Sequence, residues 1–390
     1  MLRHLLFVTL AGHGHVTPTL PLVEELVRRG HRVGYATGAE HAAAVANAGA
    51  GWVALPPLEP FTPPPQVGPE AIALWFRHYF AALRATYPVL RERCGSARPD
   101  TICYDATNWP ARVVAEQLDI PAVRCIPNLA ENEAYSLDEQ LMAGLSPNHP
   151  EMAALADDCA HFSAEYGVDL DIAATMDVTE ALNLVFIPRE FQPAGDSFDE
   201  RFCFLGPLLG HRERHEPWSP PDPVAPLLYI SLGTIFTDHL DFYRPCLEAF
   251  GDGTWQVAMT VGEMDPALLG PVPPTVDVRP RFPQPAVLRH ASAFITHAGM
   301  NSTMEALYYG VPLITVPQMP EQVANADRVQ ELGLGERMDA DTLTPQALRE
   351  TVARVIHDQQ LRANLDRMRT AIRESGGAAR GADIIEQYLP

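Results

Sequence analysis

Two series of apolar segments, each alternating with helical segments, occupy the two halves of this chain of 390 residues. The strands expected in the first half are 5–10, 32–36, 101–104 and 122–126. Those expected in the second half are 227–231, 256–260, 293–296 and 313–316. Strands that alternate with helices form parallel sheets covered by helices on both faces. The pattern therefore predicts an α/β protein with two Rossmann-like, doubly wound parallel-sheet domains that face a cleft.

A proline-rich segment separates the two series. We expect a first domain at 1–206, a stiff linker at 207–226 and a second domain at 227–365. The last segment, 366–390, has a helical pattern broken at Gly376 and Gly377, and we expect it to pack back on the first domain.

Charge and cysteine content exclude several classes of function. The net charge of −21 argues against binding to nucleic acid or to an anionic membrane surface. No apolar run reaches the roughly 18 residues that a membrane span requires. The six cysteines lack the spacing of a zinc site and suggest reduced thiols in the cytoplasm. The first ten residues are interpreted as a strand and not as a signal peptide, and the chain is expected to be a monomer or a homodimer.

The first strand leads into a turn rich in glycine and histidine. His13 and His15 follow it, Thr17 is expected to cap the next helix, and Pro18 to lie in its first turn. A neutral histidine at the carboxyl end of a strand can take a proton from a hydroxyl near pH 7. Asp105 ends another strand of the same half and can hold such a histidine in one tautomer. The alternatives are a turn histidine that caps the helix and an aspartate that caps the next one.

A second cluster of polar residues follows the strand at 293–296. His297, Gly299, Asn301 and Ser302 open a helix, whose N-terminal N–H groups and dipole favour a bound diphosphate. Glu305, one turn later, can accept hydrogen bonds from ribose hydroxyls. Ser231 and Thr234 follow the first strand of this half and can add donors to the same phosphates. An ordinary capped helix is the alternative interpretation.

These residues resemble a known signature. The run from Arg281-Phe-Pro-Gln284 through His297-Ala-Gly-Met-Asn-Ser-Thr-Met-Glu305 to Pro317-Gln-Met-Pro-Glu-Gln322 resembles the donor-binding signature of glycosyltransferase family 1. Gly14-His-Val-Thr-Pro18 is similar to the catalytic histidine motif of that family. The first half, with Tyr104-Asp-Ala-Thr-Asn-Trp-Pro-Ala111, most resembles the bacterial macrolide branch, such as the oleandomycin glycosyltransferases.

The resemblance implies the GT-B fold, an acceptor-binding first domain, a nucleotide-sugar-binding second domain, and inverting transfer without an essential metal or other cofactor. It implies that His15 is the base and that Asp105 orients it. The implied donor-binding residues are Ser231, Thr234, Arg281, Phe282, Gln284, His297, Gly299, Asn301, Ser302, Glu305, Glu321 and Gln322. Arg281 stands where the family commonly has Trp, and Glu321 where it usually has Asp. The co-substrate is expected to be a UDP-sugar or a dTDP-sugar, and Glu305 favours UDP.

The acceptor-binding site is the part of the protein that the sequence predicts least clearly. Trp75, Phe76 and Tyr79 lie at helical spacing and can line an apolar acceptor pocket, although such a stripe is more often plain core. His13, Ala106 and Ile126 are added as acceptor-binding candidates. A hydroxyl on a lipophilic natural product of the macrolide, polyketide or phenolic class is the expected acceptor. A sugar-nucleotide epimerase and a non-catalytic protein that binds nucleotide sugars remain as alternatives.

Overall fold

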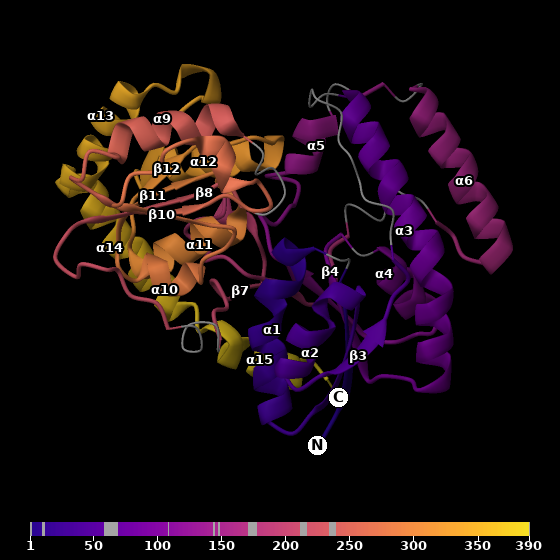
Figure 1. Ribbon diagram of the computed structural model, residues 1–390. Helices are drawn as coiled ribbons and strands as arrows, with labels where there is room; N and C mark the ends of the chain where they lie inside the picture. The colour runs from indigo at the N-terminus through magenta and orange to yellow at the C-terminus, as the bar shows by residue number, and fades with distance from the viewer. Residues whose placement is uncertain are drawn as a thin grey trace. The chain divides into compact units, whose positions relative to one another are not determined.

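The structure, a computed structural model, describes residues 2–9, 12–57, 69–107, 109–142, 145–146, 149–170, 178–210, 217–233 and 239–389. The chain divides into two compact units (Figure 1). Unit 1 comprises Met1–Gly210 and Gly376–Pro390, and unit 2 comprises His211–Ser375. The boundary expected at 366 falls inside α14 (Gln359–Glu374), a helix that belongs to unit 2. The chain returns to unit 1 only at Gly376. The expected linker at 207–226 includes the unit boundary, and its residues 211–216 lie outside the described part.

Unit 1 is built on a parallel sheet of seven strands in the order β3-β2-β1-β4-β5-β6-β7. The strands are β1 (His4–Val8), β2 (Arg32–Thr37), β3 (Gly51–Ala54), β4 (Thr101–Asp105), β5 (Ala122–Ile126), β6 (Asn183–Val185) and β7 (Phe202–Phe204). Its helices are α1 (His13–Arg28), α2 (Ala42–Asn47), α3 (Pro69–Ser96), α4 (Trp109–Gln117), α5 (Leu137–Met142), α6 (Pro150–Tyr166) and α15 (Gly377–Tyr388), with 3-10 turns at Ala39–His41 and Gly195–Ser197.

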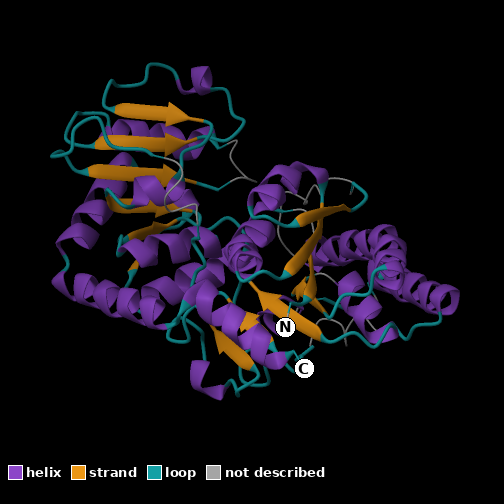
Figure 2. Cartoon of the chain, turned by 90° about the horizontal axis from the view of Figure 1, so that it is seen from below, coloured by secondary structure: helices purple, strands orange, loops and turns teal. Residues whose placement is uncertain are grey.

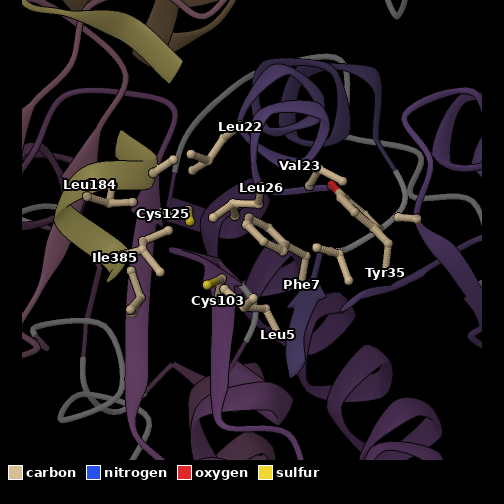
Figure 3. Packing of buried hydrophobic residues seen from close by; sticks show 14 of the residues in the cluster. Leu5, Phe7, Leu22, Val23, Leu26, Tyr35, Cys103, Cys125, Leu184 and Ile385 are labelled. Atoms are coloured by element: carbon tan, nitrogen blue, oxygen red, sulfur yellow. The ribbon is translucent and has the colours of Figure 1, made fainter. Parts of the chain in front are cut away.

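The central strand β1 divides the core of unit 1 into two layers. Successive side chains of a strand point to opposite faces of the sheet. Leu5 and Phe7 therefore join the cluster that includes Leu22 of α1 and Ile385 of α15 (Figure 3). Leu6 and Val8 of the same strand join a second cluster, in which side chains of α3, α4 and α6 are buried. Each face of the sheet is thus covered by helices.

Helix α1 begins earlier than predicted. Thr17 was expected to be its cap and Pro18 to lie in its first turn, but the helix starts at His13 and holds both residues in its interior. The carbonyl of Gly12 accepts the N–H groups of His15 and Val16, each at 3.0 Å, so the helix starts without a side-chain cap. The turn and the helix are therefore joined directly, and His15 lies in the first helical turn.

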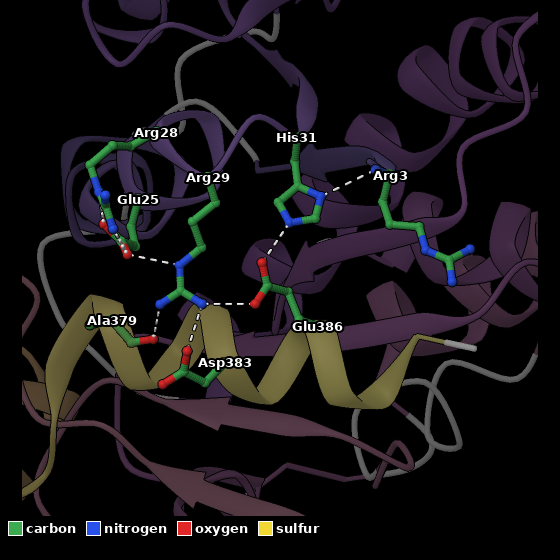
Figure 4. Close-up of polar contacts among 8 residues, drawn as sticks. All are labelled: Arg3, Glu25, Arg28, Arg29, His31, Ala379, Asp383 and Glu386. Atoms are coloured by element: carbon green, nitrogen blue, oxygen red, sulfur yellow. Dashed lines mark hydrogen bonds and ion pairs between the residues drawn. The ribbon is translucent and has the colours of Figure 1, made fainter. Parts of the chain in front are cut away.

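The last helix, α15, belongs to unit 1. The guanidinium of Arg29, at the end of α1, donates to Asp383 at 2.6 Å, to Glu386 at 2.8 Å and to the carbonyl of Ala379 at 2.9 Å (Figure 4). His31 lies 2.8 Å from the other oxygen of Glu386. These partly exposed ion pairs fix the position of the helix, while its apolar face supplies most of the stabilisation.

Unit 2 is built on a parallel sheet of six strands in the order β10-β9-β8-β11-β12-β13, drawn as arrows in Figure 2. The strands are β8 (Leu227–Ser231), β9 (Gln256–Thr260), β10 (Val276–Arg279), β11 (Ala291–Thr296), β12 (Leu313–Thr315) and β13 (Gly335–Arg337). The helices are α9 (Leu240–Phe250), α10 (Gln284–Leu288), α11 (Met300–Tyr309), α12 (Pro320–Glu331), α13 (Pro345–His357) and α14, with 3-10 turns at Pro266–Leu269 and Ala340–Thr342. The two helix-covered parallel sheets confirm the predicted fold class.

Two further features concern the whole chain. All six cysteines carry free thiols, and five of them are buried, the exception being the half-buried Cys203. In the part of the chain that the structure describes, no helix is both long enough and apolar enough to span a bilayer.

We expect Ile385→Ala to lower the free energy of unfolding of unit 1 by about 2–5 kcal/mol, because it leaves a cavity in a fully buried position. Gln387→Ala, at an exposed position of the same helix, is the matched control and should change stability by less than about 0.5 kcal/mol. Urea unfolding followed by circular dichroism measures both. Equal stability of the two variants would contradict the assignment of α15 to this core.

Candidate functional site

In unit 1, His15 and Asp105 are brought together by strand pairing. Strands β1 and β4 are parallel neighbours, with Val8 opposite Tyr104, so the segments that follow them lie at the same edge of the sheet. Nδ1 of His15 lies 2.9 Å from Oδ2 of Asp105. The carboxylate side chain has no exposed surface, whereas the imidazole is 29% exposed. The predicted pair is therefore in contact, with its histidine facing solvent.

The environment of Asp105 determines which tautomer His15 adopts. Burial acts to raise the pKa of Asp105, but the charge of His15 and hydrogen bonds from His15 and Thr107 outweigh it and lower the pKa overall. Thr107 donates to Oδ1 through its backbone N–H at 3.0 Å and its hydroxyl at 2.5 Å. An ionised carboxylate can only accept hydrogen bonds, so Nδ1 of His15 carries the proton and Nε2 carries the lone pair.

His13 has a different environment. Its exposed ring lies 3.2 Å from the hydroxyl of Thr17 and packs against the ring of His41 at a centroid distance of 5.4 Å. His41, which the sequence analysis missed, follows the carboxyl end of β2 in a 3-10 turn and is 6% exposed. Its position after an apolar strand was the signal that could have found it.

A chain of buried hydroxyls holds the first turn of α1 to the sheet. Thr9 donates to the hydroxyl of Tyr35 at 3.0 Å, and that hydroxyl lies 2.6 Å from the hydroxyl of Thr19. Thr19 in turn donates to the carbonyl of Val16 at 2.8 Å. The chain ends on the residue after His15, so it ties the turn that carries the imidazole to β2. Sequence analysis missed it, because tyrosine and threonine are ordinary strand residues.

The predicted acceptor-binding residues are divided between core and surface. On α3, Phe76 is 6% exposed and packs in the core, whereas Trp75 and Tyr79 are half-buried, with ring centroids 6.1 Å apart. Ala106 is half-buried after β4, and Ile126 is buried at the end of β5. Their role in acceptor binding stays a prediction.

In unit 2, His297 is enclosed between two glycines. A Cβ atom added at either Gly233 or Gly299 would overlap its imidazole ring. The residue is half-buried, and the loss of solvent around the ring lowers its pKa to about 4. His297 is therefore neutral at physiological pH, and its ring can donate one hydrogen bond without carrying a charge.

The helix that follows, α11, begins at Met300 with Gly299 as its N-cap. A glycine has no side chain that could accept the N–H groups of the first turn, and the dipole favours an anion there. Asn301 is half-buried and Ser302 is 9% exposed, both in this first turn. The helix end is thus suited to an anion, and its binding of a diphosphate stays a prediction.

Glu305 lies deeper in the same site and is 4% exposed. The side-chain amide of Gln284 donates to Oε2 of Glu305 at 2.8 Å and to the hydroxyl of Ser302 at 3.2 Å. The structure therefore joins three of the predicted donor-binding residues in one hydrogen-bonded group, at the start of α10 and on one face of α11.

Two further predicted positions, Arg281 and Phe282, precede α10. Arg281 is exposed, and Phe282 is buried with Trp218 and Tyr229 around its ring. The guanidinium that lies over Phe282, 4.9 Å from its centroid, belongs to Arg279 and not to Arg281. The sequence analysis did not single out Arg279 or Trp218.

The remaining candidates follow β8 and β12. Ser231 is buried, and its hydroxyl accepts the N–H of Gly233 at 3.3 Å; Thr234 lies outside the described residues. Glu321 is half-buried in the first turn of α12, and Oε1 of Gln322 accepts the N–H of Gln318 at 2.8 Å. Across the described segments, no three His, Cys, Asp or Glu side chains are grouped so as to hold a metal ion.

Comparisons with known proteins agree with this arrangement. Residues 245–377 match the family described as erythromycin biosynthesis protein CIII-like, C-terminal domain. The chain is 37% identical to the NDP-glycosyltransferase YjiC of Bacillus subtilis (strain 168), covering 99% of this chain and 97% of that protein. It is 35% identical to the oleandomycin glycosyltransferase of Streptomyces antibioticus, covering 99% and 91%.

The crystal structure of CalG4, the calicheamicin glycosyltransferase, superposes with a TM-score of 0.88 at 40% identity, covering 100% of this chain and 98% of that one. The matches to YjiC, to the oleandomycin glycosyltransferase and to CalG4 extend over both units. The chain therefore belongs to the GT-B glycosyltransferases, in the family that includes the macrolide glycosyltransferases.

Proposed function

We propose that the protein is an inverting, metal-independent glycosyltransferase that moves a sugar from a UDP-sugar or a dTDP-sugar to a hydroxyl of a lipophilic natural product. The observation that carries this proposal is the contact between Nδ1 of His15 and the buried carboxylate of Asp105. That contact leaves Nε2 as the basic nitrogen on a partly exposed ring, which is what the deprotonation of an acceptor hydroxyl requires.

The reaction consists of one proton transfer, one bond formed and one bond broken. Nε2 of His15 takes the acceptor proton while the acceptor oxygen forms a bond to the anomeric carbon. The bond from that carbon to the diphosphate oxygen breaks on the opposite face, so the configuration inverts. Asp105 stabilises the imidazolium that forms, as in other pairs of histidine and carboxylate. The nucleoside diphosphate leaves with its bonding electron pair.

Unit 2 supplies the groups that hold this leaving group. The N-terminus of α11 and the neutral imidazole of His297 offer hydrogen bonds to phosphate oxygens, and they stabilise the charge that develops as the bond breaks. Glu305 accepts from ribose hydroxyls, and Glu321 and Gln322 bind the sugar hydroxyls. The N–H groups of α11 and of His297 take the part that a divalent cation plays in metal-dependent transferases.

The class of acceptor is supported by the relatives and by α3. The relatives are named for oleandomycin and calicheamicin, both natural products. The half-buried rings of Trp75 and Tyr79 offer apolar surface of the kind that a lipophilic acceptor contacts.

We expect His15→Ala to lower kcat by about 10²- to 10⁴-fold or more, because general-base help is lost. The assay is mass spectrometry of acceptor panels with UDP-glucose, dTDP-glucose or dTDP-rhamnose in EDTA, in which the wild type should remain active. His161→Ala, at an exposed position on α6, is the control and should retain activity.

Three outcomes would contradict the proposal. Activity that survives in His15→Ala but disappears in His13→Ala would move the base to His13. Loss of wild-type activity in EDTA, restored by a divalent cation, would show a metal requirement. Interconversion of the sugar nucleotide without an acceptor would indicate an epimerase, and binding without any turnover a non-catalytic protein.

A second prediction concerns pH. Because burial lowers the pKa of His297 to about 4, its ring is neutral between pH 5.5 and 8 in the free protein, and we expect it to stay neutral on the diphosphate. The Kd of UDP-glucose or dTDP-glucose, measured by calorimetry without an acceptor, should keep a constant ratio between wild type and His297→Gln over this range. An affinity of the wild type that rises selectively as the pH falls would show that His297 becomes charged on the diphosphate.

A third prediction tests the ribose contact. UDP should bind at least about tenfold more tightly than its 2′-deoxy analogue, since a hydrogen bond to a buried carboxylate is worth about 1.5–3 kcal/mol. The ratio should fall toward one in Glu305→Ala. Glu321→Ala is the matched control and should keep the ratio, because UDP lacks the transferred sugar whose hydroxyls Glu321 would bind. A ratio near one in the wild type would remove Glu305 from the ribose site.

A further inference from the structure

The turn before α11 contains an unusual backbone conformation. Ala298 has φ of +65°, in the left-handed region that favours glycine, and its side chain is fully buried. Only two other non-glycine residues in the described segments, Asp119 and Ala194, have a positive φ, and both belong to unit 1. A residue with a Cβ atom stays in this conformation only where its surroundings hold it there.

Two side chains hold both peptide groups of Ala298. The hydroxyl of Thr296 accepts its N–H at 3.3 Å, and the side-chain amide of Asn325 donates to its carbonyl at 3.0 Å. Asn325 comes from α12, 27 residues later in the chain, and is fully buried.

Asn325 makes this contact at a cost to the core. Its Oδ1 is buried and accepts no hydrogen bond from any described part of the chain. A buried acceptor without a partner is unfavourable, and an apolar side chain of similar size would avoid that cost. The contact with the carbonyl of Ala298 is the hydrogen bond that its amide makes in the structure.

The segment that Asn325 holds carries the groups that face the diphosphate. Ala298 separates His297, whose ring fits between Gly233 and Gly299, from Gly299, the N-cap of α11. Rotation about the bonds of Ala298 would move the ring out of this space and would tilt the first-turn N–H groups of the helix. One peptide unit therefore sets the direction of both sets of donors.

We propose that Asn325 is a positioning residue for the donor, which holds Ala298 in its left-handed conformation and thereby orients His297 and the N-terminus of α11 toward the diphosphate. The inference rests on the proposed function. It assigns the positioning of the donor-binding groups to a residue outside the sites described above. Asn325 acts through the backbone of Ala298 and does not itself contact the donor.

The test uses Asn325→Leu, which removes the donated hydrogen bond and leaves a buried apolar side chain of similar size. The Kd of UDP and of dTDP, whichever binds the wild type, should rise about tenfold or more by calorimetry. The KM of the acceptor should not change. Adding Ala298→Gly to this variant should recover a large part of the affinity, because glycine adopts a positive φ without strain.

Asn364→Leu is the matched control. The amide of Asn364 donates to the carbonyls of Leu332 and Gly333, each at 3.1 Å, and so holds another turn with positive φ in the same unit. This variant should lose stability without losing donor affinity. If Asn325 had a purely structural role, both variants would lose stability and keep their donor affinity, and adding Ala298→Gly would not change the affinity.

The titration of His297, followed by NMR of its ring, is a readout that needs neither donor nor acceptor. In Asn325→Leu the pKa should rise from about 4 toward its ordinary value, because the ring leaves its enclosure, and it should not rise in Asn364→Leu. If the titration moves while the wild type binds neither nucleotide, the positioning of His297 stands and the proposed function fails. If neither titration nor affinity changes, the inference is overturned.

Discussion

The candidate site in unit 1 depends on a negative charge held inside the protein. The carboxylate of Asp105 has no exposed surface, and a buried charge is stable only if it is paired and hydrogen-bonded. His15 and Thr107 meet this need, and they can do so because β1 and β4 are adjacent parallel strands whose carboxyl ends coincide. The direction of the imidazole is therefore a consequence of the sheet. The hydroxyl chain from Thr9 to Val16 adds a second anchor, on the opposite neighbour of β1.

The candidate site in unit 2 uses a histidine in the opposite way. Burial keeps the ring of His297 neutral, whereas His15 is paired with a charge and exposed on one side. A ring that pairs with a carboxylate is suited to taking a proton. A ring that stays neutral is suited to donating a fixed hydrogen bond. The two glycines that enclose His297, Gly233 after β8 and Gly299 two residues beyond the histidine, leave no room for a Cβ beside the ring.

Much of the fold and of the site is predictable from the sequence, for local reasons. Apolar runs bounded by turns predict β5, β8 and β9 with their observed ends, and the polar residues after strands predict the contact of His15 with Asp105. What is missed has other causes. The start of α1 depends on the carbonyl of Gly12 and not on a capping side chain. β6, β7 and β13 have three residues each, and so short a strand is predictable only within a longer apolar run, as for β12. The role of Asn325 depends on a backbone angle 27 residues away.

The path of the chain makes the core of unit 1 depend on a segment that follows unit 2. Unit 2 is inserted between two parts of unit 1, since the chain leaves unit 1 after Gly210 and returns at Gly376. The returning helix packs on α1, the helix that carries His15, and Gly381 approaches Leu22 and Leu205 so closely that a Cβ there would meet both. The core of unit 1 beneath His15 is therefore complete only when α15 is in place. A chain cut before Gly376 keeps all of unit 2 but lacks the helix that packs on α1, so the cut acts first on the support of His15 and not on unit 2.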